Sequence, residues 1–280
     1  MRIATWNVNG LRARSERVAA WLDASTPDVV LLQETKCDPE QVPAGLFSDR
    51  GYEVAARGAG GRNGVLIASR VGLDDVRDDL ASHEPAHSAT AAGGDPLPNL
   101  LLEPRFLSAS CAGLRVASCY APNGREVGAP HWHAKLRWFA ALRSWSVAAL
   151  AHDPALLLGG DFNVAPSDED VWDPAALAGA THVTAEERLA WGALLELGLV
   201  DTARRLAPEG ERAPFTWWDY RNGAFHRGWG MRIDHLLASP AAGRLVSSDV
   251  DREGRKGAQP SDHAALSLVL DRAAPSTTAP

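Results

Sequence analysis

Cysteine is scarce in this sequence, because the 280 residues include only Cys37, Cys111 and Cys119. Three residues at such wide and irregular spacing cannot build a disulfide framework or the four-ligand cluster of a structural zinc site. We therefore expect three ordinary, partly buried thiols and a protein of the reducing cytoplasm.

Long apolar runs are missing as well. No stretch approaches the roughly 18 consecutive apolar residues of a membrane-spanning helix. The opening segment MRIATWNVNG contains charge and asparagine where a secretion signal needs a continuous apolar run. We therefore expect no membrane partner and a protein that remains in the compartment where it is made.

An excess of positive charge is also absent, since the net charge is −7 and the pI is about 5.7. Proteins that coat nucleic acid nonspecifically are normally basic, so this class is disfavoured. A local basic rim is still available, although each of its members fits an ordinary solvated position equally well. The candidates are Arg12, Arg14, Arg17, Arg57, Arg62, Arg125, Lys135, Arg137, Arg221, Arg227 and Arg232.

What the chain does contain is material for a large core, with 45% hydrophobic residues. No shift in composition marks a second domain, so we expect one domain over residues 1–272. Residues 86–99 are rich in Ala, Gly and Pro and predict an exposed loop. Residues 273–280 have nothing to bury and predict a disordered tail.

The first third of the chain predicts a strand, a helix and a strand. Residues 3–8 are β-prone, and Val18, Trp21 and Leu22 recur at helical spacing before Pro27. Residues 28–33 form an apolar run typical of a strand buried on both faces. A right-handed crossover makes the two strands parallel, so Asn7 and Glu34 reach the same rim at their carboxyl ends.

The middle of the chain repeats this order. Residues 116–120 predict a strand that ends at Tyr120, and residues 136–150 an amphipathic helix. Its inward side chains are Leu136, Phe139, Leu142 and Trp145. Residues 155–158 predict a buried strand that leads into Gly159-Gly160-Asp161-Phe162-Asn163.

Near the C-terminus the polar residues precede the strands instead of following them. Asp234 and His235 open the apolar segment 236–238, and Asp262 and His263 open the segment 264–270. If these strands run antiparallel to the earlier ones, their beginnings lie where the others end. The polar side chains at all these strand ends then converge on one edge.

A carboxylate at the end of a buried strand is unusual unless it is paired or binds a cation, so Glu34 is conspicuous. Magnesium takes hard oxygen ligands, few of them from protein. Glu34 is therefore our first-choice ligand, with Asn7 beside it. The alternative for Glu34 is an ordinary surface acid.

Two interpretations fit Asp161 and Asn163. On an extended segment, residues two apart point to one face, so the pair could orient a water and hold a phosphoryl oxygen. A Gly-Gly-Asp sequence is equally typical of an Asx turn that closes a strand.

His263 needs a carboxylate partner if it is to act in catalysis. Asp262 is adjacent, and on an extended chain neighbouring side chains diverge, so Asp262 is a poor choice. Asp234 is the better candidate.

Six short segments stand in order along nearly the whole chain. They are TWNVNGLRAR (5–14), LLQETK (31–36), YAPNG (120–124), GGDFNVAP (159–166), RIDHLLAS (232–239) and PSDHAAL (260–266). Together they resemble the exonuclease III family of abasic-site endonucleases, within the larger endonuclease/exonuclease/phosphatase superfamily. In the family pattern, the Asp of RIDHLLAS pairs with the His of SDH, as proposed above for Asp234 and His263.

The resemblance implies a DNase I-like, four-layer α/β sandwich of two packed mixed sheets flanked by helices. It implies hydrolysis of DNA on the 5′ side of an abasic site, with 3′→5′ exonuclease action and removal of 3′ blocking groups as further activities. The implied partner is double-stranded DNA with abasic sites or 3′ ends, bound by a monomer. The implied metal is Mg²⁺, with Mn²⁺ as a substitute, and the implied ligands are Asn7, Glu34, Asp161, Asn163, Asp262 and His263.

The mechanism that we expect is an in-line attack by water. Asp161 is the leading base, and His263 oriented by Asp234 is the competing base. Asn163 and Tyr120 would stabilise charge on the phosphoryl oxygens, and Asn123 and Arg125 would contact phosphate.

The aromatic segment FTWWDYRNGAFHRGWGMRID (215–234) is what favours DNA over other substrates of the superfamily. By resemblance, Trp217, Met231 and Ile233 would line an apolar pocket for a deoxyribose without a base, and Arg221 would contact DNA. The alternative is that Trp217 or Trp218 belongs to the core. Family members often carry a bulkier residue where Met231 stands.

Other interpretations stay open. His131 and His133 form an HxH pair that could bind metal, but they sit in an expected loop without further ligands. The chain could hydrolyse a small phosphorylated substrate instead of DNA, or it could be a DNA-binding module without catalysis. The complete set of polar residues argues against the last of these.

Overall fold

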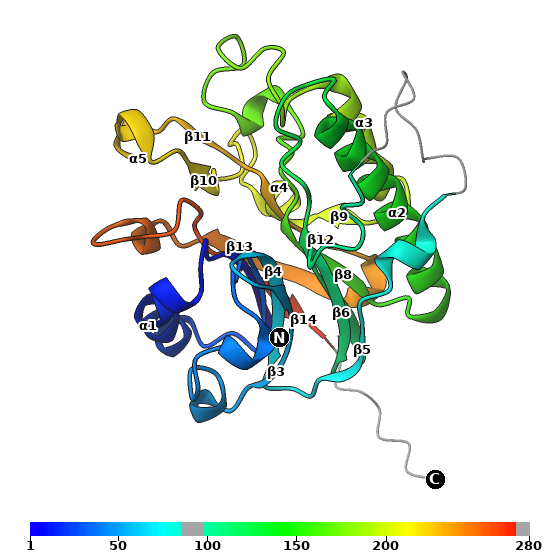
Figure 1. Cartoon of the computed structure of the whole chain (residues 1–280), viewed down its shortest axis with the longest axis vertical. Coiled ribbons are helices and arrows are strands. Elements are labelled where there is room, and N and C mark those ends of the chain that lie inside the picture. Colours follow the sequence, from blue (N-terminus) through cyan, green and yellow to red (C-terminus); the bar gives the residue numbers. More distant parts are fainter. Residues whose placement is uncertain (86–97, 273–280) are drawn as a thin grey trace.

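Two six-stranded β-sheets form the centre of the molecule in the computed structural model, which describes residues 1–85 and 98–272 (Figure 1). The first sheet has the order β13-β14-β1-β2-β4-β3. Its strands are β1 (Arg2–Asn7), β2 (Val29–Gln33), β3 (Glu53–Ala59), β4 (Arg62–Ser69), β13 (Arg244–Val250) and β14 (Leu266–Asp271). The expected tail at 273–280 and most of the expected loop at 86–99 lie outside the described residues.

The second sheet has the order β5-β6-β7-β8-β12-β9. Its strands are β5 (Asp74–Arg77), β6 (Phe106–Cys111), β7 (Leu114–Tyr120), β8 (Leu156–Asp161), β9 (Val200–Asp201) and β12 (Asp234–Ala238). A separate ribbon pairs β10 (Trp217–Trp218) with β11 (Gly230–Met231). Both large sheets are mixed, because β1–β2 and β7–β8 are parallel whereas β14–β1 and β12–β8 are antiparallel. The parallel directions expected for β1–β2 and β7–β8 are confirmed, and β14 and β12 meet the condition of running antiparallel to the earlier strands.

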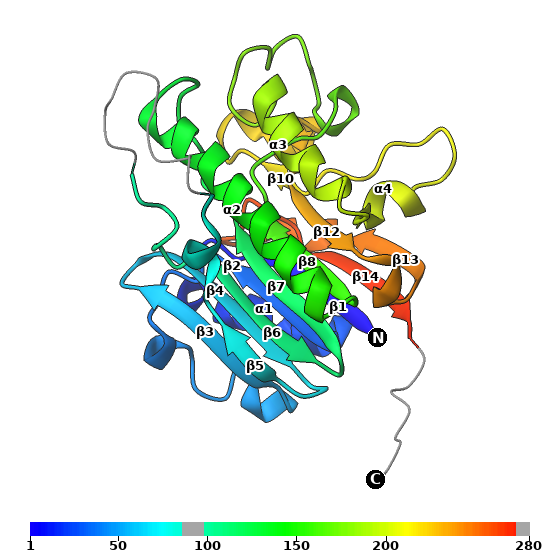
Figure 2. The same cartoon turned by 90° about the vertical axis from the view of Figure 1, so that its right-hand side faces the viewer.

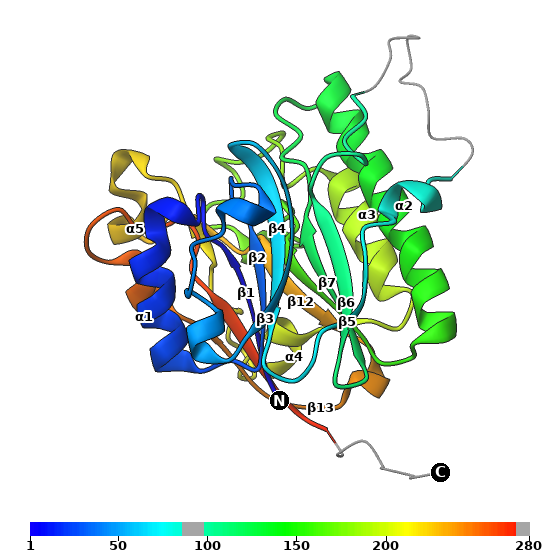
Figure 3. The ribbon, with the colours of Figure 1, turned by 60° about the horizontal axis from the view of Figure 1, so that its bottom comes forward.

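Helices cover the outer faces of both sheets, which gives four layers (Figure 3). The helices of these layers are α1 (Ser15–Ser25), α2 (Pro130–His152) and α3 (Ala185–Leu195). Two short helices lie elsewhere: α4 (Thr202–Leu206) beside β12 and β13, and α5 (Ala224–Arg227) between β10 and β11. Helix α1 packs on the first sheet, and α2 lies along β6, β7 and β8 of the second (Figure 2). The expected four-layer α/β sandwich is confirmed. Among the described residues, no helix combines the length and apolar character needed to cross a lipid bilayer.

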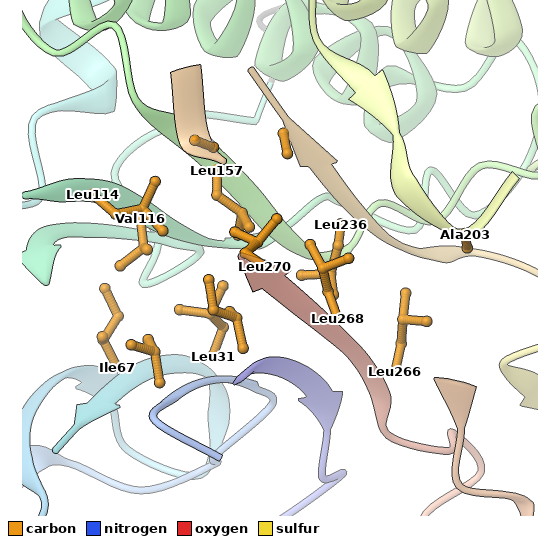
Figure 4. Packing of buried hydrophobic residues seen from close by; sticks show 14 of the residues in the cluster. Leu31, Ile67, Leu114, Val116, Leu157, Ala203, Leu236, Leu266, Leu268 and Leu270 are labelled. Carbon is orange, nitrogen blue, oxygen red and sulfur yellow. The ribbon is translucent and has the colours of Figure 1, made fainter. Parts of the chain in front are cut away.

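Strand alternation explains the layers, because successive side chains enter different cores. Leu31 and Leu157 point between the sheets, where they meet side chains from the facing sheet (Figure 4). Leu32 packs under α1 instead, and Leu158 under α2. Because both faces of the central strands are buried, consecutive residues are apolar, and these strands appear as continuous apolar runs in the sequence.

The expected helix at 136–150 is correct in kind but begins six residues earlier, at Pro130. Proline is compatible with the first helical turn because the missing N–H is not needed there. His131 and His133 therefore lie in the helix and not in a loop. Phe139, Leu142 and Trp145 are buried as expected, whereas Leu136 is only half-buried.

Strand β8 also extends further than its apolar core, through Gly159 and Gly160 to Asp161. A Cβ atom on Gly160 would lie 1.8 Å from the carbonyl oxygen of Cys119 in the neighbouring strand, and one on Gly159 would lie 2.5 Å from Leu31 of the facing sheet. The two glycines thus allow the close approach that brings Asp161 to the rim.

We expect Gly160→Ala to destabilise the fold by about 3 kcal/mol, because a backbone atom of β7 cannot move out of the way of the new methyl group. Urea denaturation measures the change. Gly192→Ala in α3 is the matched control: its Cβ would meet nothing within 4 Å, and alanine is favoured over glycine in a helix by up to about 1 kcal/mol. Equal stability of G160A and the parent would contradict this role of Gly160.

Candidate active site

The polar ends of strands from both sheets meet at one rim of the sandwich. In the first sheet, Asn7 pairs with Gln33 next to Glu34. In the second, Asp161 pairs with Tyr120 on one side and Asp234 on the other. The convergence that strand order predicts is therefore present in the structure.

Asn7 connects the two sheets through its side-chain amide. Its Nδ2 donates to Glu34 Oε1 and to Asp161 Oδ2, each at 2.9 Å, and Asn7 is fully buried. Both amide hydrogens are used, so the two carboxylate oxygens lie no further apart than twice that distance. Asn7 Oδ1 accepts from the Asn9 N–H and keeps a second lone pair for another partner.

Glu34 is held from three sides. Its backbone is left-handed, with φ of 50°, a conformation that costs energy for a residue with a side chain. Lys36 Nζ lies 2.8 Å from Oε2, and the Tyr120 hydroxyl donates to Oε1 at 2.9 Å. Burial raises the pKa of Glu34, but hydrogen bonds from Asn7 and Lys36 outweigh it and leave the pKa below its ordinary value. Glu34 is therefore a fixed, ionised carboxylate.

His263 is oriented by Asp234, with Nδ1 at 2.8 Å from Asp234 Oδ2, and its Nε2 faces Asp161 Oδ2 at 3.7 Å. All three side chains are buried. Burial lowers the pKa of His263, but the carboxylates of Asp234 and Asp161 more than offset this and raise it to about 10. Burial raises the pKa of Asp161 to about 7; His263 opposes that rise and Asp234 adds to it.

The segment after β8 is a turn and not an extended strand. Asp161 Oδ1 accepts from the Asn163 N–H at 2.9 Å, which is the Asx turn that was one of the two interpretations. Asn163 is left-handed, with φ of 51°. Its Nδ2 donates to the carbonyl of Ala121 at 2.9 Å, and its Oδ1 faces Asn123 Nδ2 at 3.4 Å. The side chains of Asp161 and Asn163 thus both lie at the rim, but through a turn and not through an extended segment.

Asp262 turns away from His263, as the alternation of side chains predicts. Its Oδ1 accepts from Asn9 Nδ2 at 2.9 Å, and its Oδ2 accepts from Trp217 Nε1 at 3.0 Å. Asn9 also takes a hydrogen bond from Lys36 Nζ, at 2.5 Å. Asn9 and Lys36 are not among the residues predicted from the sequence, although each follows a predicted ligand by two residues, a spacing that could have indicated them.

An apolar cluster adjoins the polar rim. It contains Val171, Met231 and Ile233, with Trp217 packed against it. Strand pairing runs from His263 to Trp217, from Trp217 to Met231 and from Met231 to Val171. Neighbouring strands lie about 4.8 Å apart, so the cluster begins within two strand spacings of the imidazole. Trp218, by contrast, is fully buried and belongs to the core.

A basic rim requires exposed side chains, and only part of the expected set is exposed. The prediction of a surface position is wrong for Lys135 and Arg232, because both side chains are buried. Lys135 pairs with Glu187, and Arg232 pairs with Asp170 and Asp201. The exposed members are Arg12, Arg62, Arg125, Arg221 and Arg227. Arg221 is paired with Asp219.

Arg125 and Asn123 line a cavity of about 390 Å³ beside the rim, together with Arg62, Arg105 and His131. This wall of the cavity is positively charged and lies next to the loop that follows Tyr120. The location suits a chain of phosphates that continues beyond the rim.

One group of potential metal ligands stands out among the described residues: Asp161, Asp234 and His263 place one ligand atom each within 4.8 Å of one another. The HxH pair is not part of it, because residues two apart on a helix face different directions. Asp234 Oδ1 is buried without a hydrogen-bond partner. The oxygen-rich rim, with Glu34 and Asp161 on a shared amide, has the hard donors that a small divalent cation requires.

Comparison with known proteins gives consistent results. The family model for the endonuclease/exonuclease/phosphatase family matches residues 4–263. Exodeoxyribonuclease III of Haemophilus influenzae is 30% identical, over 95% of this chain and 98% of the relative. The exodeoxyribonuclease of Bacillus subtilis is 29% identical, over 97% of this chain and all of the relative.

Solved structures agree over almost the whole chain. The 3′-5′ exonuclease from Neisseria meningitidis is 37% identical, with a TM-score of 0.84, and covers 97% of this chain and 100% of its own. A Neisseria 3′ phosphatase bound to product DNA hairpin is 36% identical, with a TM-score of 0.86 and the same coverage. An AP endonuclease from Archaeoglobus fulgidus is 34% identical, with a TM-score of 0.85, again over 97% and 100%.

The charge on His263 predicts a pH dependence of stability. The raised pKa means that the folded state retains a proton that the unfolded chain releases above about pH 6.5. This stabilisation is complete below that pH and is lost as the pH rises toward 10. In EDTA, we expect the free energy of unfolding to fall by about 1–2 kcal/mol between pH 7.5 and 9, a range above the titration of Asp161.

Urea denaturation at the two pH values measures this change. His263→Asn should lack it, while His152→Asn, at an exposed position in the last turn of α2, should retain it. The same pH slope in H263N as in the parent would show that His263 is not charged in the folded protein.

Proposed function

The chain belongs to the endonuclease/exonuclease/phosphatase family, and on this basis we propose that it is a magnesium-dependent nuclease that cleaves DNA on the 5′ side of abasic sites. It is a phosphodiester hydrolase related to exodeoxyribonuclease III and to the AP endonucleases. The observation that carries the proposal is the cross-sheet arrangement of Glu34, Asn7 and Asp161, closed on one side by His263 and Asp234.

The cation would be held chiefly by Glu34 and Asp161, with the free lone pair of Asn7 Oδ1 beside them. Asn163 and Asp262 complete the proposed ligand set, whereas His263, whose Nδ1 is held by Asp234, is left to the phosphoryl group. A bound Mg²⁺ supplies charge that polarises the scissile phosphate and stabilises the departing oxygen. The oxygen-only character of the Glu34–Asn7–Asp161 group fits Mg²⁺, and Mn²⁺ accepts the same donors.

Asp161 is the base that the electrostatics favour. A carboxyl group with a pKa of about 7 exchanges its proton with water near neutral pH, which suits a general base. His263, with a pKa of about 10, is already protonated there and cannot accept another proton. We therefore propose that His263 stabilises the negative charge of the phosphoryl group by donating a hydrogen bond from Nε2–H, and that Asp234 holds the ring in place.

Tyr120 and Asn163 differ in what they can still donate. The single hydroxyl proton of Tyr120 goes to Glu34, and burial together with the Glu34 carboxylate raises the pKa of Tyr120 well above its ordinary value, so the proton stays. Tyr120 then orients Glu34 in the free enzyme. Asn163 uses one amide hydrogen on Ala121 and retains the other for a phosphoryl oxygen.

Double-stranded DNA is the substrate that the surroundings of the site support. Phosphates could follow the cavity lined by Asn123 and Arg125, and Arg221 would contact the strand from the far side of the rim. The apolar cluster of Met231, Ile233 and Trp217 offers a deoxyribose without a base a site that a complete nucleotide would not fit. A sugar of this kind also costs less to unstack.

Cleavage at 3′ ends is the second activity that we propose, because two of the similar structures are those of a 3′-5′ exonuclease and a 3′ phosphatase. A small phosphorylated substrate is less compatible with an open rim and a basic cavity beside it. A binding module without catalysis is disfavoured by the complete catalytic set. The three cysteines are free and buried, which fits the reducing cytoplasm that we propose as the location, and we propose that the chain acts as a monomer.

We expect Glu34→Gln and His263→Asn to lower cleavage of an abasic duplex by about a thousandfold or more, because each removes a charge on which the chemistry depends. The measurement is a gel assay with Mg²⁺ on duplexes carrying one abasic analogue, no lesion or a recessed 3′ end. Glu53→Gln and His152→Asn change the same residue types at exposed positions and serve as controls.

EDTA should stop cleavage by the parent enzyme, and added Mg²⁺ should restore it. Cleavage of abasic DNA by E34Q or H263N at the rate of the controls would refute the role of that residue. A parent enzyme that acts only on small phosphate esters would refute the proposed substrate.

The apolar cluster generates a specificity prediction. Ile233→Ala removes atoms from the cluster that is proposed to receive the baseless sugar, so we expect the ratio of abasic to undamaged cleavage to fall about tenfold. Ile67→Ala is the matched control, since it removes the same atoms from the inter-sheet core away from the rim. An unchanged ratio in I233A, or an equal fall in I67A, would show that the cluster does not select the substrate.

A further inference from the structure

A polar network lies directly behind the proposed phosphate-contacting amides of Asn123 and Asn163. At its centre, Lys135 of α2 and Glu187 of α3 form an ion pair with 2.5 Å between Nζ and Oε1, and both side chains are completely buried. Thr181 shares its hydroxyl proton between Glu187 Oε1 and the carbonyl of Asn123. The network therefore joins two helices to the loops of the candidate site.

The backbone of Asn163 is the point on which this network acts. Lys135 Nζ donates to its carbonyl oxygen at 2.7 Å, and the Nδ1 atom of His182 lies 2.6 Å from the same oxygen. Asn163 is in the left-handed region, which is unfavourable without such restraint. Two donors on one carbonyl supply that restraint.

His182 contacts the side-chain amide of Asn123 and the backbone carbonyl of Asn163, and the chemistry of these partners determines which ring nitrogen carries the hydrogen. Its Nε2 lies 3.3 Å from Asn123 Nδ2, which can only donate, so Nε2 must accept. Its Nδ1 faces the Asn163 carbonyl, which can only accept, so Nδ1 must carry the hydrogen. One neutral tautomer, with the hydrogen on Nδ1, satisfies both contacts.

The same contact determines which way the Asn123 amide faces. Its Nδ2 points to His182 and to Asn163 Oδ1, and its Oδ1 accepts from the Arg125 N–H at 3.1 Å. Rotation of the amide by half a turn would place Oδ1 against the acceptor nitrogen of His182. The orientation of Asn123 at the mouth of the cavity is therefore fixed by a side chain that itself has no free ring nitrogen for substrate.

We propose that His182 is a positioning residue for the hydrolysis reaction: its Nδ1-protonated imidazole holds the amide of Asn123 and the left-handed turn of Asn163 in the orientation that receives the phosphate. This inference rests on the proposed function. It gives His182 no contact with the substrate. Its effect on catalysis passes through Asn123 and Asn163.

A double-mutant cycle tests this dependence. We expect His182→Leu to lower kcat/KM on an abasic duplex by about 10- to 100-fold, the usual effect of losing a group that orients another. In an Asn123→Ala background, the same change should cost at least about threefold less than in the parent, because the part of its effect that passes through the Asn123 amide is gone and only the part that passes through the Asn163 turn remains. His152→Leu, at an exposed position, is the control and should leave both backgrounds unchanged.

If His182→Leu lowers activity only through poorer folding, it should lower kcat/KM by the same factor in the parent and in the Asn123→Ala background. Equal factors in the two backgrounds would overturn the proposal. If the parent fails to cleave abasic DNA at all, the proposed function is wrong. The double-mutant cycle is then run on the undamaged or the 3′-recessed duplex, whichever the parent cleaves.

The tautomer provides a readout that does not depend on activity. In ¹⁵N-labelled parent protein at pH 7, the His182 ring should show a protonated Nδ1 and an unprotonated Nε2, the less common of the two neutral forms. Assignment uses the signal that disappears in H182L. A ring protonated at Nε2, or at both nitrogens, would contradict the proposed contacts even if the enzyme is fully active.

Discussion

The side-chain amide of Asn7 is the interaction on which the site depends. Asn7 ends a strand of the first sheet, yet one of its two amide hydrogens goes to Asp161 at the end of a strand of the second. The other goes to Glu34, so a single amide holds two carboxylates that come from different sheets. Packing of the two sheets against each other is thereby coupled directly to the geometry of the chemistry.

Charge is distributed so that an acidic protein can act on an acidic substrate. Glu34, Asp161, Asp234 and Asp262 are concentrated at one rim, where Lys36 and His263 offset part of their charge. A bound divalent cation would offset more of it. The net charge of −7 therefore says little about the potential that a phosphate would meet at the rim.

Sequence reasoning located the chemistry well where strand order governs position. A right-handed crossover requires Asn7 and Glu34 to share a rim, and alternation along the chain separates Asp262 from His263. It failed where position depends on partners distant in the sequence. Nothing near Lys135 or Arg232 indicates that Glu187 or Asp170 will bury them, and no local pattern indicates that His182 packs behind Asn163. Lys135 and Arg232 are predicted at the surface because the sequence around each of them contains no recognisable ion-pair partner.

The measurement that tests this account most directly is anomalous X-ray scattering from crystals soaked in Mn²⁺, which takes the same oxygen ligands as Mg²⁺ and can be located without reference to activity. The account predicts an anomalous peak at the shared lip of the sheets, within coordinating distance of the carboxylates of Glu34 and Asp161. A fully soaked crystal with manganese bound elsewhere, and no peak between these two residues, would contradict it.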